Sequence, residues 1–157
     1  MQNIEELVYE LLKLHKITLT TAESATGGMI AATLINVPGI SEFFQEGYVT
    51  YSNDAKVKMI GVDRTLIDTY GVVSREVAKN MAVSAAKTAG TDAALSVTGV
   101  AGPDGGTIEC PVGTVYIGCY LKGKTVVEHH LFNGDRLTVR KAATNRALAL
   151  LAEQIQS

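Results

Sequence analysis

Hydrophobic positions follow helical and strand periods in alternation along this chain. Apolar residues recur three and four positions apart over 3–15, which predicts an amphipathic helix. Runs that alternate apolar and polar residues, such as 46–51 and 112–121, predict strands instead. In chain order, the predicted elements are a helix over 3–15, a strand over 17–20, a helix over 29–35, a strand over 46–51, helices over 55–60, 64–70 and 74–89, strands over 93–98, 112–121 and 125–132, and a final helix from 135.

Helices and strands mix along the whole sequence, and the turn Lys122-Gly123-Lys124 joins two strands into a hairpin. This mixture predicts an α/β fold, a three-layer α/β/α sandwich with a mixed β-sheet. The 157 residues fit one domain of ordinary size, 1–157, and no repeat, low-complexity segment or linker divides them.

The composition narrows the classes of function. Hydrophobic residues make up 46% of the chain, enough for a packed core, and the net charge is −2 without a long basic run. The sequence therefore lacks the electrostatic footprint of a protein that binds nucleic acid or an anionic membrane surface. No apolar stretch is long enough to span a bilayer, and the chain starts without a signal segment, so we expect a cytoplasmic protein.

Residue spacing gives no indication of a metal site. The two cysteines, Cys110 and Cys119, have neither paired metal-ligand spacing nor a disulfide framework. His129 and His130 are adjacent on a predicted strand, so their side chains point to opposite faces and cannot bind one metal together. We expect neither a metal nor a cofactor.

The segment 21–28 carries a candidate nucleophile where the first strand turns into the second helix. The first N–H groups of a helix have no intrahelical partner and carry a partial positive charge. We therefore predict Ser24 as a nucleophile, with the oxyanion held by N–H groups of Thr26, Gly27 or Gly28. The alternative is an ordinary N-cap followed by two glycines that allow close packing.

Tyr51 and Lys56 form a second candidate pair, at the end of a predicted strand and in the first turn of the next helix. A cation in that turn opposes the helix dipole, and partial burial disfavours its charge further. Both effects lower the pKa of a lysine toward the value that a general base needs at neutral pH. The alternative is a solvated surface lysine beside a core tyrosine.

A glycine-rich loop over 99–106 follows the end of a predicted strand, which is where open α/β sheets bind ligands. Its glycines let the backbone approach a ligand and turn N–H groups toward an anion. The loop matches neither the Rossmann nor the P-loop pattern, and a mobile surface loop is the alternative. Arg136 and Arg140, one helical turn apart, are candidates to grip a phosphate together, or are two solvated arginines.

Taken together, these segments resemble the CinA C-terminal domain family, whose stand-alone members are nicotinamide-nucleotide amidases. The resemblance covers nearly the whole chain in family order and spacing. It is carried by Thr21-Ala22-Glu23-Ser24 with Thr26-Gly27-Gly28, Tyr48-Val49-Thr50-Tyr51-Ser52-Asn53 with Ala55-Lys56, Gly71-Val72-Val73-Ser74, the run 97–106, Pro111-Val112-Gly113-Thr114-Val115-Tyr116, and Phe132-Asn133-Gly134-Asp135-Arg136.

The resemblance implies an enzyme that hydrolyses the carboxamide of nicotinamide mononucleotide to nicotinic acid mononucleotide and ammonia, in pyridine-nucleotide recycling. The family's catalytic serine, tyrosine and lysine match Ser24, Tyr51 and Lys56. It also implies a homo-oligomer, with a dimer as the expectation, and no metal. We expect the ribose phosphate to be bound by Thr98, Gly99, Gly102, Gly105, Gly106 and Arg140.

Three positions depart from the family pattern. Ala25 stands where the family commonly has cysteine, which argues against that thiol as an essential nucleophile. Cys110 stands where a lysine is frequent, so we expect different contacts to the phosphate or the ring of the substrate. Asn133 replaces a frequent proline and is expected to matter little. Two other functions stay open: a non-catalytic nucleotide-binding adaptor or regulatory module, and an amidase for another small amide.

Overall fold

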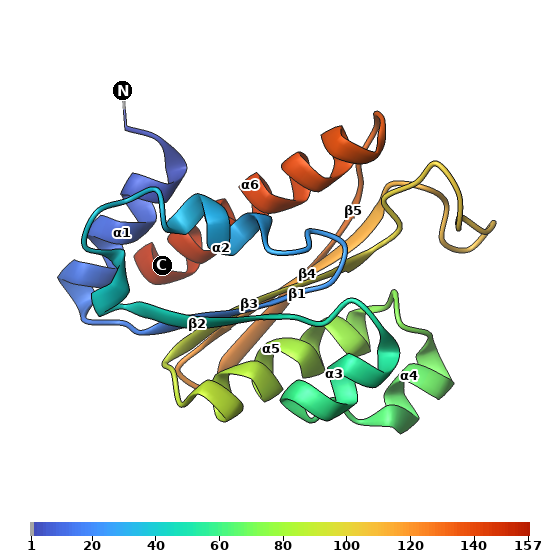
Figure 1. Cartoon of the computed structure of the whole chain (residues 1–157), viewed down its shortest axis with the longest axis horizontal. Helices are drawn as coiled ribbons and strands as arrows, with labels where there is room; N and C mark the ends of the chain where they lie inside the picture. Colours follow the sequence, from blue (N-terminus) through green and yellow to red (C-terminus); the bar gives the residue numbers. More distant parts are fainter. Residues whose placement is uncertain (1) are drawn as a thin grey trace.

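A mixed β-sheet forms the middle layer of the structure, a computed structural model that describes residues 2–157 (Figure 1). The elements in chain order are α1 (Ile4–His15), β1 (Leu19–Glu23), α2 (Met29–Leu34), the short 3₁₀ helix η1 (Ile40–Glu42), β2 (Phe44–Val49), α3 (Asn53–Ile60), α4 (Arg64–Tyr70), α5 (Arg75–Ala89), β3 (Ala93–Gly99), β4 (Thr114–Leu121), β5 (Lys124–Leu131) and α6 (Arg136–Gln156). The five strands lie in the order β2-β1-β3-β4-β5.

Helices cover both faces of this sheet (Figure 1). α1, α2 and α6 lie on one face, and α3, α4 and α5 lie on the other. β1 is parallel to both β2 and β3, whereas β4 is antiparallel to β3 and to β5. The predicted α/β fold with a mixed sheet between two helical layers is confirmed. Of the helices in the described residues, none is long and apolar enough to cross a lipid bilayer.

Each face of the sheet has its own apolar core. Under α1, α2 and α6, the core includes Leu12, Leu95 and Leu148, all fully buried. Under α3, α4 and α5, a smaller core contains Met81 and Ile60. Burial of apolar surface on both faces makes the central strands inaccessible to water. The sheet therefore acts as a rigid support for the loops at its edges.

The first strand lies later in the chain than the sequence predicts. β1 covers Leu19–Glu23 rather than 17–20, so three of its residues are polar and nevertheless fully buried. Thr20 Oγ1 donates to Glu46 O at 2.7 Å, and the Glu23 carboxylate is hydrogen-bonded within the fold. Because these partners satisfy the polar groups, a central strand is formed without apolar alternation.

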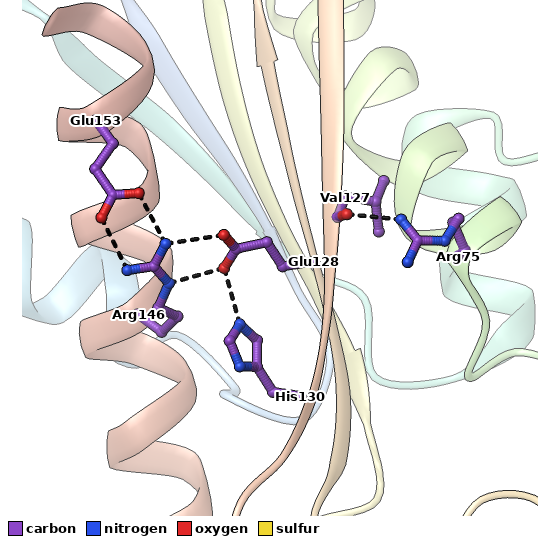
Figure 2. Close-up of polar contacts among 6 residues, drawn as sticks. All are labelled: Arg75, Val127, Glu128, His130, Arg146 and Glu153. Atoms are coloured by element: carbon purple, nitrogen blue, oxygen red, sulfur yellow. Dashed lines mark hydrogen bonds and ion pairs between the residues drawn. The ribbon is translucent and has the colours of Figure 1, made fainter. Parts of the chain in front are cut away.

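α6 is tied to the edge strand β5 by a network of charged side chains (Figure 2). Arg146 donates to both carboxylate oxygens of Glu128 on β5, at 2.7 and 2.8 Å, and to Glu153 on its own helix. His130 Nε2 lies 2.8 Å from Glu128 Oε1. These bonds lower the pKa of Glu128 to about 2, because the Arg146 guanidinium and His130 favour the ionised carboxylate.

Three parallel strands end at one edge of the sheet. Glu23, the last residue of β1, pairs with Val49 at the end of β2 and with Val97 on β3. The segments that follow β1, β2 and β3 therefore start side by side. In open α/β sheets this carboxyl edge is where ligands bind.

Candidate active site

Ser24 and Lys56 meet at the carboxyl edge of the sheet. Ser24 directly follows β1, and its N–H donates to Val97 O on β3 at 3.0 Å. Lys56 lies on α3, and its Nζ donates to Ser24 Oγ at 3.0 Å and to Thr50 O at 2.8 Å. The predicted nucleophile and the predicted base are in direct contact.

The Lys56 side chain is buried, with only 1% of its surface exposed. Ser52 caps α3 through a hydrogen bond from Ala55 N–H, which places Lys56 near the positive end of the helix. Burial disfavours the ammonium form and lowers the pKa of Lys56 to about 8. A lysine with this pKa has a fraction of neutral amine at neutral pH that can accept a proton from a serine hydroxyl.

A tight turn over 24–28 carries Ser24 from β1 into α2. Gly27 N–H donates to Ser24 O at 3.0 Å. Gly27 and Gly28 have φ angles of 57° and 101°, in the left-handed region where residues with a side chain are strained. The two glycines therefore let the chain reverse within five residues, so that Ser24 stays at the strand end.

The start of α2 differs from the expectation of free N–H groups. Glu23 accepts hydrogen bonds from Ile30 N–H at 2.8 Å and Ala31 N–H at 3.0 Å, so the buried carboxylate satisfies these helix donors. Gly27 N–H is bound to Ser24 O. Of the three predicted oxyanion donors, Thr26 and Gly28 retain a backbone N–H without a protein acceptor among residues 2–157.

Arg140, predicted to bind the substrate phosphate, contacts the backbone of the turn after Ser24. Its Nε donates to Ala25 O at 3.0 Å and one terminal nitrogen donates to Thr26 O at 3.1 Å. The guanidinium thus holds the turn after Ser24 and does not line the cavity beside Ser24. Arg140 thus contacts the backbone of the turn, and the expectation that it contacts a substrate phosphate stays a prediction.

The arginine at the cavity is Arg136, one helical turn earlier on α6. Its guanidinium donates to Gly102 O at 2.7 Å and to the Tyr51 hydroxyl at 3.0 Å. Tyr51 lies just after β2, lines the same cavity and is 64% exposed. The phenol is therefore held at the mouth of the site and is not a core residue.

The cavity between these groups has a volume of about 240 Å³. Its lining combines Ser24, Lys56, Tyr51 and Arg136 with backbone and small side chains of the segments 72–73 and 98–101. Two lining side chains are basic and none of the lining residues is acidic. The cavity therefore favours an anionic or strongly polar ligand.

Only part of the glycine-rich loop reaches this cavity. Gly99 and Thr98 line it, although the Thr98 hydroxyl donates to Val72 O at 2.9 Å. Gly102, Gly105 and Gly106 do not line it. Ala101 also lines the cavity, whereas the later part of the loop projects beyond the sheet (Figure 1). The predicted phosphate-binding loop is therefore only partly assembled at Ser24.

The family model for the CinA C-terminal domain matches residues 1–155 of the chain. The chain belongs to the CinA C-terminal domain family. A competence-damage inducible protein of Clostridium beijerinckii is 55% identical over 95% of the chain, and a CinA-like protein of Kosmotoga olearia is 49% identical over 94%. The chain spans about a third of the length of these curated relatives, 36% in both cases.

Two solved structures of the CinA superfamily share this fold over 90% or more of their length. A protein from Klebsiella pneumoniae matches with a TM-score of 0.93 and 33% identity, covering 99% of both chains. A protein from Escherichia coli matches with a TM-score of 0.90 and 37% identity, covering 96% of this chain and 90% of that one.

Two departures from the CinA pattern lie at or beside the cavity. Ala25 lines it next to Ser24, so no thiol stands beside the serine. Cys110 does not line the cavity, but its Sγ lies 3.8 Å from the backbone oxygen of Val73, which does.

Within residues 2–157, no group of three or more His, Cys, Asp and Glu side chains lies close enough together to hold a metal ion.

Sequence reasoning missed several lining residues. Val72 and Val73 reach the cavity from the segment before α5, and Asn53 reaches it from the start of α3. No chemical pattern marks two valines as binding residues, because they supply shape rather than reacting groups. The pair of arginines on α6 was a signal for Arg136, but spacing alone treats it and Arg140 alike.

Proposed function

We propose that the protein hydrolyses the carboxamide of nicotinamide mononucleotide to nicotinic acid mononucleotide and ammonia. The observation that carries this proposal is the 3.0 Å contact between Lys56 Nζ and Ser24 Oγ, with the lysine buried and its pKa lowered to about 8. A serine bound to a lysine with a depressed pKa is an activated nucleophile for acyl transfer. The family resemblance supplies the substrate class.

In the first half-reaction, neutral Lys56 takes the hydroxyl proton of Ser24 while Oγ attacks the carboxamide carbon. Lys56 contacts Ser24 directly, so this transfer needs no relay through Tyr51. The resulting oxyanion is held by backbone N–H groups of the turn, with Thr26 and Gly28 as the candidates that have no protein acceptor. Removal of one such donor typically lowers the rate by about 100- to 1,000-fold.

The carbon–nitrogen bond then breaks as the Lys56 ammonium returns its proton to the leaving nitrogen, which departs as ammonia. An ester between Ser24 and the nicotinoyl group remains. Water attacks this ester with Lys56 again as the base, and Ser24 leaves with a proton. The products are the free hydroxyl and the carboxylate of nicotinic acid mononucleotide.

The basic side chains of the cavity fit the phosphate end of this substrate. Arg136 lies at the cavity mouth, bound to Gly102 O and the Tyr51 hydroxyl, so it is poised beside a group entering past Tyr51. A guanidinium binds phosphate with paired N–H donors. We assign the ribose phosphate to Arg136 with backbone of Gly99, and assign Tyr51 to the ring or ribose at the mouth.

The test is ammonia release from purified protein with nicotinamide mononucleotide, beside a Ser24→Ala variant. Release that disappears in the variant supports both the reaction and the nucleophile. Release that survives in Ser24→Ala discards this role of Ser24. Ligand binding without release would instead favour a nucleotide-binding adaptor or regulatory module, and a panel of other small amides distinguishes another amidase.

A further inference from the structure

The Glu23 carboxylate joins the end of β1 to the two segments that follow it. Only 1% of Glu23 is exposed. Its Oε1 accepts from the Thr26 hydroxyl and from Ile30 N–H, both at 2.8 Å. Its Oε2 accepts from Ala31 N–H at 3.0 Å and, at 3.4 Å, from the Thr21 hydroxyl. One side chain thereby fixes the strand, the turn that carries Ser24 and the first turn of α2.

Arg140 holds the same turn from α6, which lies on the same face of the sheet as α2. It donates to the carbonyl oxygens of Ala25 and Thr26. Because a peptide unit is planar and trans, a carbonyl of Ala25 that points at Arg140 turns the N–H of Thr26 to the opposite side. The guanidinium thus sets the direction of a backbone donor next to Ser24.

We infer that Glu23 and Arg140 are positioning residues, which together hold the 24–28 turn in the conformation that brings Ser24 Oγ to Lys56 Nζ. Their effect on turnover rests on the proposed role of Ser24. Neither side chain lines the cavity, so both act through the turn and not on a ligand. Misplacement of a reacting group by about 1 Å lowers a rate by about 100-fold.

Glu23→Gln is a sensitive test, because neither of the two orientations of the glutamine amide satisfies both backbone N–H groups that Glu23 binds. Each carboxylate oxygen faces a backbone N–H, of Ile30 on one side and of Ala31 on the other. An NH₂ group on either side would oppose a donor that cannot reverse, unlike the Thr26 hydroxyl. Glu23→Gln therefore disturbs the turn, although the glutamine side chain has nearly the same shape as glutamate.

Arg140→Ala is the second variant and keeps the buried core of β1 intact. Arg146→Ala is its matched control, since Arg146 lies on the same helix and binds Glu128 and Glu153 away from the cavity (Figure 2). Both alanine variants remove one arginine with its hydrogen bonds from α6. Only Arg140→Ala removes bonds to the turn.

The experiment combines turnover of nicotinamide mononucleotide with an NMR titration of the Lys56 side chain in each folded protein. We expect Arg140→Ala and Glu23→Gln to lower kcat by about 10- to 100-fold with a small change in KM. We also expect the pKa of Lys56 to rise from about 8 toward the ordinary 10.5 as the displaced turn admits water. Arg146→Ala should change neither quantity.

A Lys56 pKa and a kcat that stay at the wild-type values in Arg140→Ala would overturn the inference, even if stability falls. If Glu23→Gln fails to fold, Arg140→Ala decides alone. If the unchanged protein releases no ammonia, the proposed function fails, and the Lys56 titration still decides whether the two residues position the turn.

Discussion

Lys56 Nζ lies 3.0 Å from Ser24 Oγ, although 32 positions separate the two residues along the chain. Two different elements bring them together: a turn after β1 carries the serine, and the capped helix α3 carries the lysine. The strands β1 and β2 that precede these elements are parallel neighbours. The contact is therefore a consequence of sheet order, and its chemistry comes from the burial of Lys56.

The rate of the proposed reaction should follow the ionisation of Lys56. With a pKa of about 8, the neutral amine is scarce at pH 6, so kcat/KM should rise about tenfold per pH unit and level off above pH 8. Lys56→Met should lower the rate by about 100- to 10,000-fold and remove this acid limb. Measurement of ammonia release between pH 5.5 and about 9.5 checks both. Lys58→Met, at an exposed position of the same helix, is the control. An unchanged acid limb in Lys56→Met would show that another group is the base.

The ionisation of Lys56 should also make the free energy of unfolding depend on pH. Between pH 8 and 10.5 the unfolded chain binds a proton on Lys56 that the folded protein does not, so the free energy of unfolding rises with pH across this window. The rise attributable to Lys56 is about 3 kcal/mol. Denaturant unfolding of the wild type and of Lys56→Met at both ends of this pH window measures the contribution of Lys56. The two proteins have all other titrating groups in common, so these cancel in the comparison. If the two proteins show parallel pH dependence, Lys56 is not desolvated as described.

Sequence reasoning singled out Ser24 and Lys56 because both lie at strand-to-helix junctions, and the structure brings the two side chains into contact. Their catalytic roles stay a prediction. Of the two arginines at the start of the last helix, sequence reasoning named Arg140 and not Arg136 as a substrate-binding residue. The two residues share one helical face. Only the packing of α6 over the 24–28 turn decides that Arg140 binds this turn, whereas Arg136 lines the cavity and binds Gly102 O and the Tyr51 hydroxyl. The role of Glu23 was hidden for a similar reason, since its partners lie on a helix whose position depends on the whole fold.

The fold class was predictable from the alternation of helical and strand periods, but the bounds of β1 were not. Thr20, Thr21 and Glu23 are polar, and polarity argues against a central strand when only the sequence is known. Their burial depends on partners from other segments, such as Glu46 O for Thr20. Tertiary hydrogen bonds of this kind leave no periodic signal.

Tyr51→Phe should weaken binding of nicotinamide mononucleotide. The hydroxyl accepts a hydrogen bond from Arg136 at 3.0 Å, and the ring is 64% exposed at the cavity. Without this bond the Arg136 guanidinium is no longer held in one orientation at the cavity. We therefore expect KM for nicotinamide mononucleotide to rise by about tenfold. Tyr70→Phe, at an exposed position away from the cavity, is the control. Equal KM values in the two variants would remove Tyr51 from the binding role.

The network on β5 and α6 should stabilise the protein only above acidic pH. The pKa of Glu128 is lowered to about 2 by the hydrogen bonds from Arg146, whereas the unfolded carboxyl titrates near 4.5. This stabilisation is present above pH 4.5 and is lost as pH falls through about 2. Arg146→Ala should lower Tm by a few degrees at pH 7, since partly exposed ion pairs contribute about 1 kcal/mol. Thermal scans that show the same difference at pH 7 and pH 2 would contradict this.

Gly118→Ala should test how closely α5 packs on the sheet. Gly118 lies on β4, and an added Cβ would meet the backbone oxygen of Ala78 on α5 at 2.8 Å and would crowd the Ser96 hydroxyl. That hydroxyl already donates to Ala78 O at 2.6 Å, so it cannot move without losing its own buried hydrogen bond. Overpacking of this kind costs about 1–3 kcal/mol. Gly61→Ala is unsuitable as a control, because the φ angle of 74° at Gly61 would strain an alanine. Ala82→Gly on α5 is the control, since it measures how much stability is lost when only the helix is weakened. Unfolding in urea should show a clear loss for Gly118→Ala, and an unchanged midpoint would mean that α5 lies farther from β4 than described.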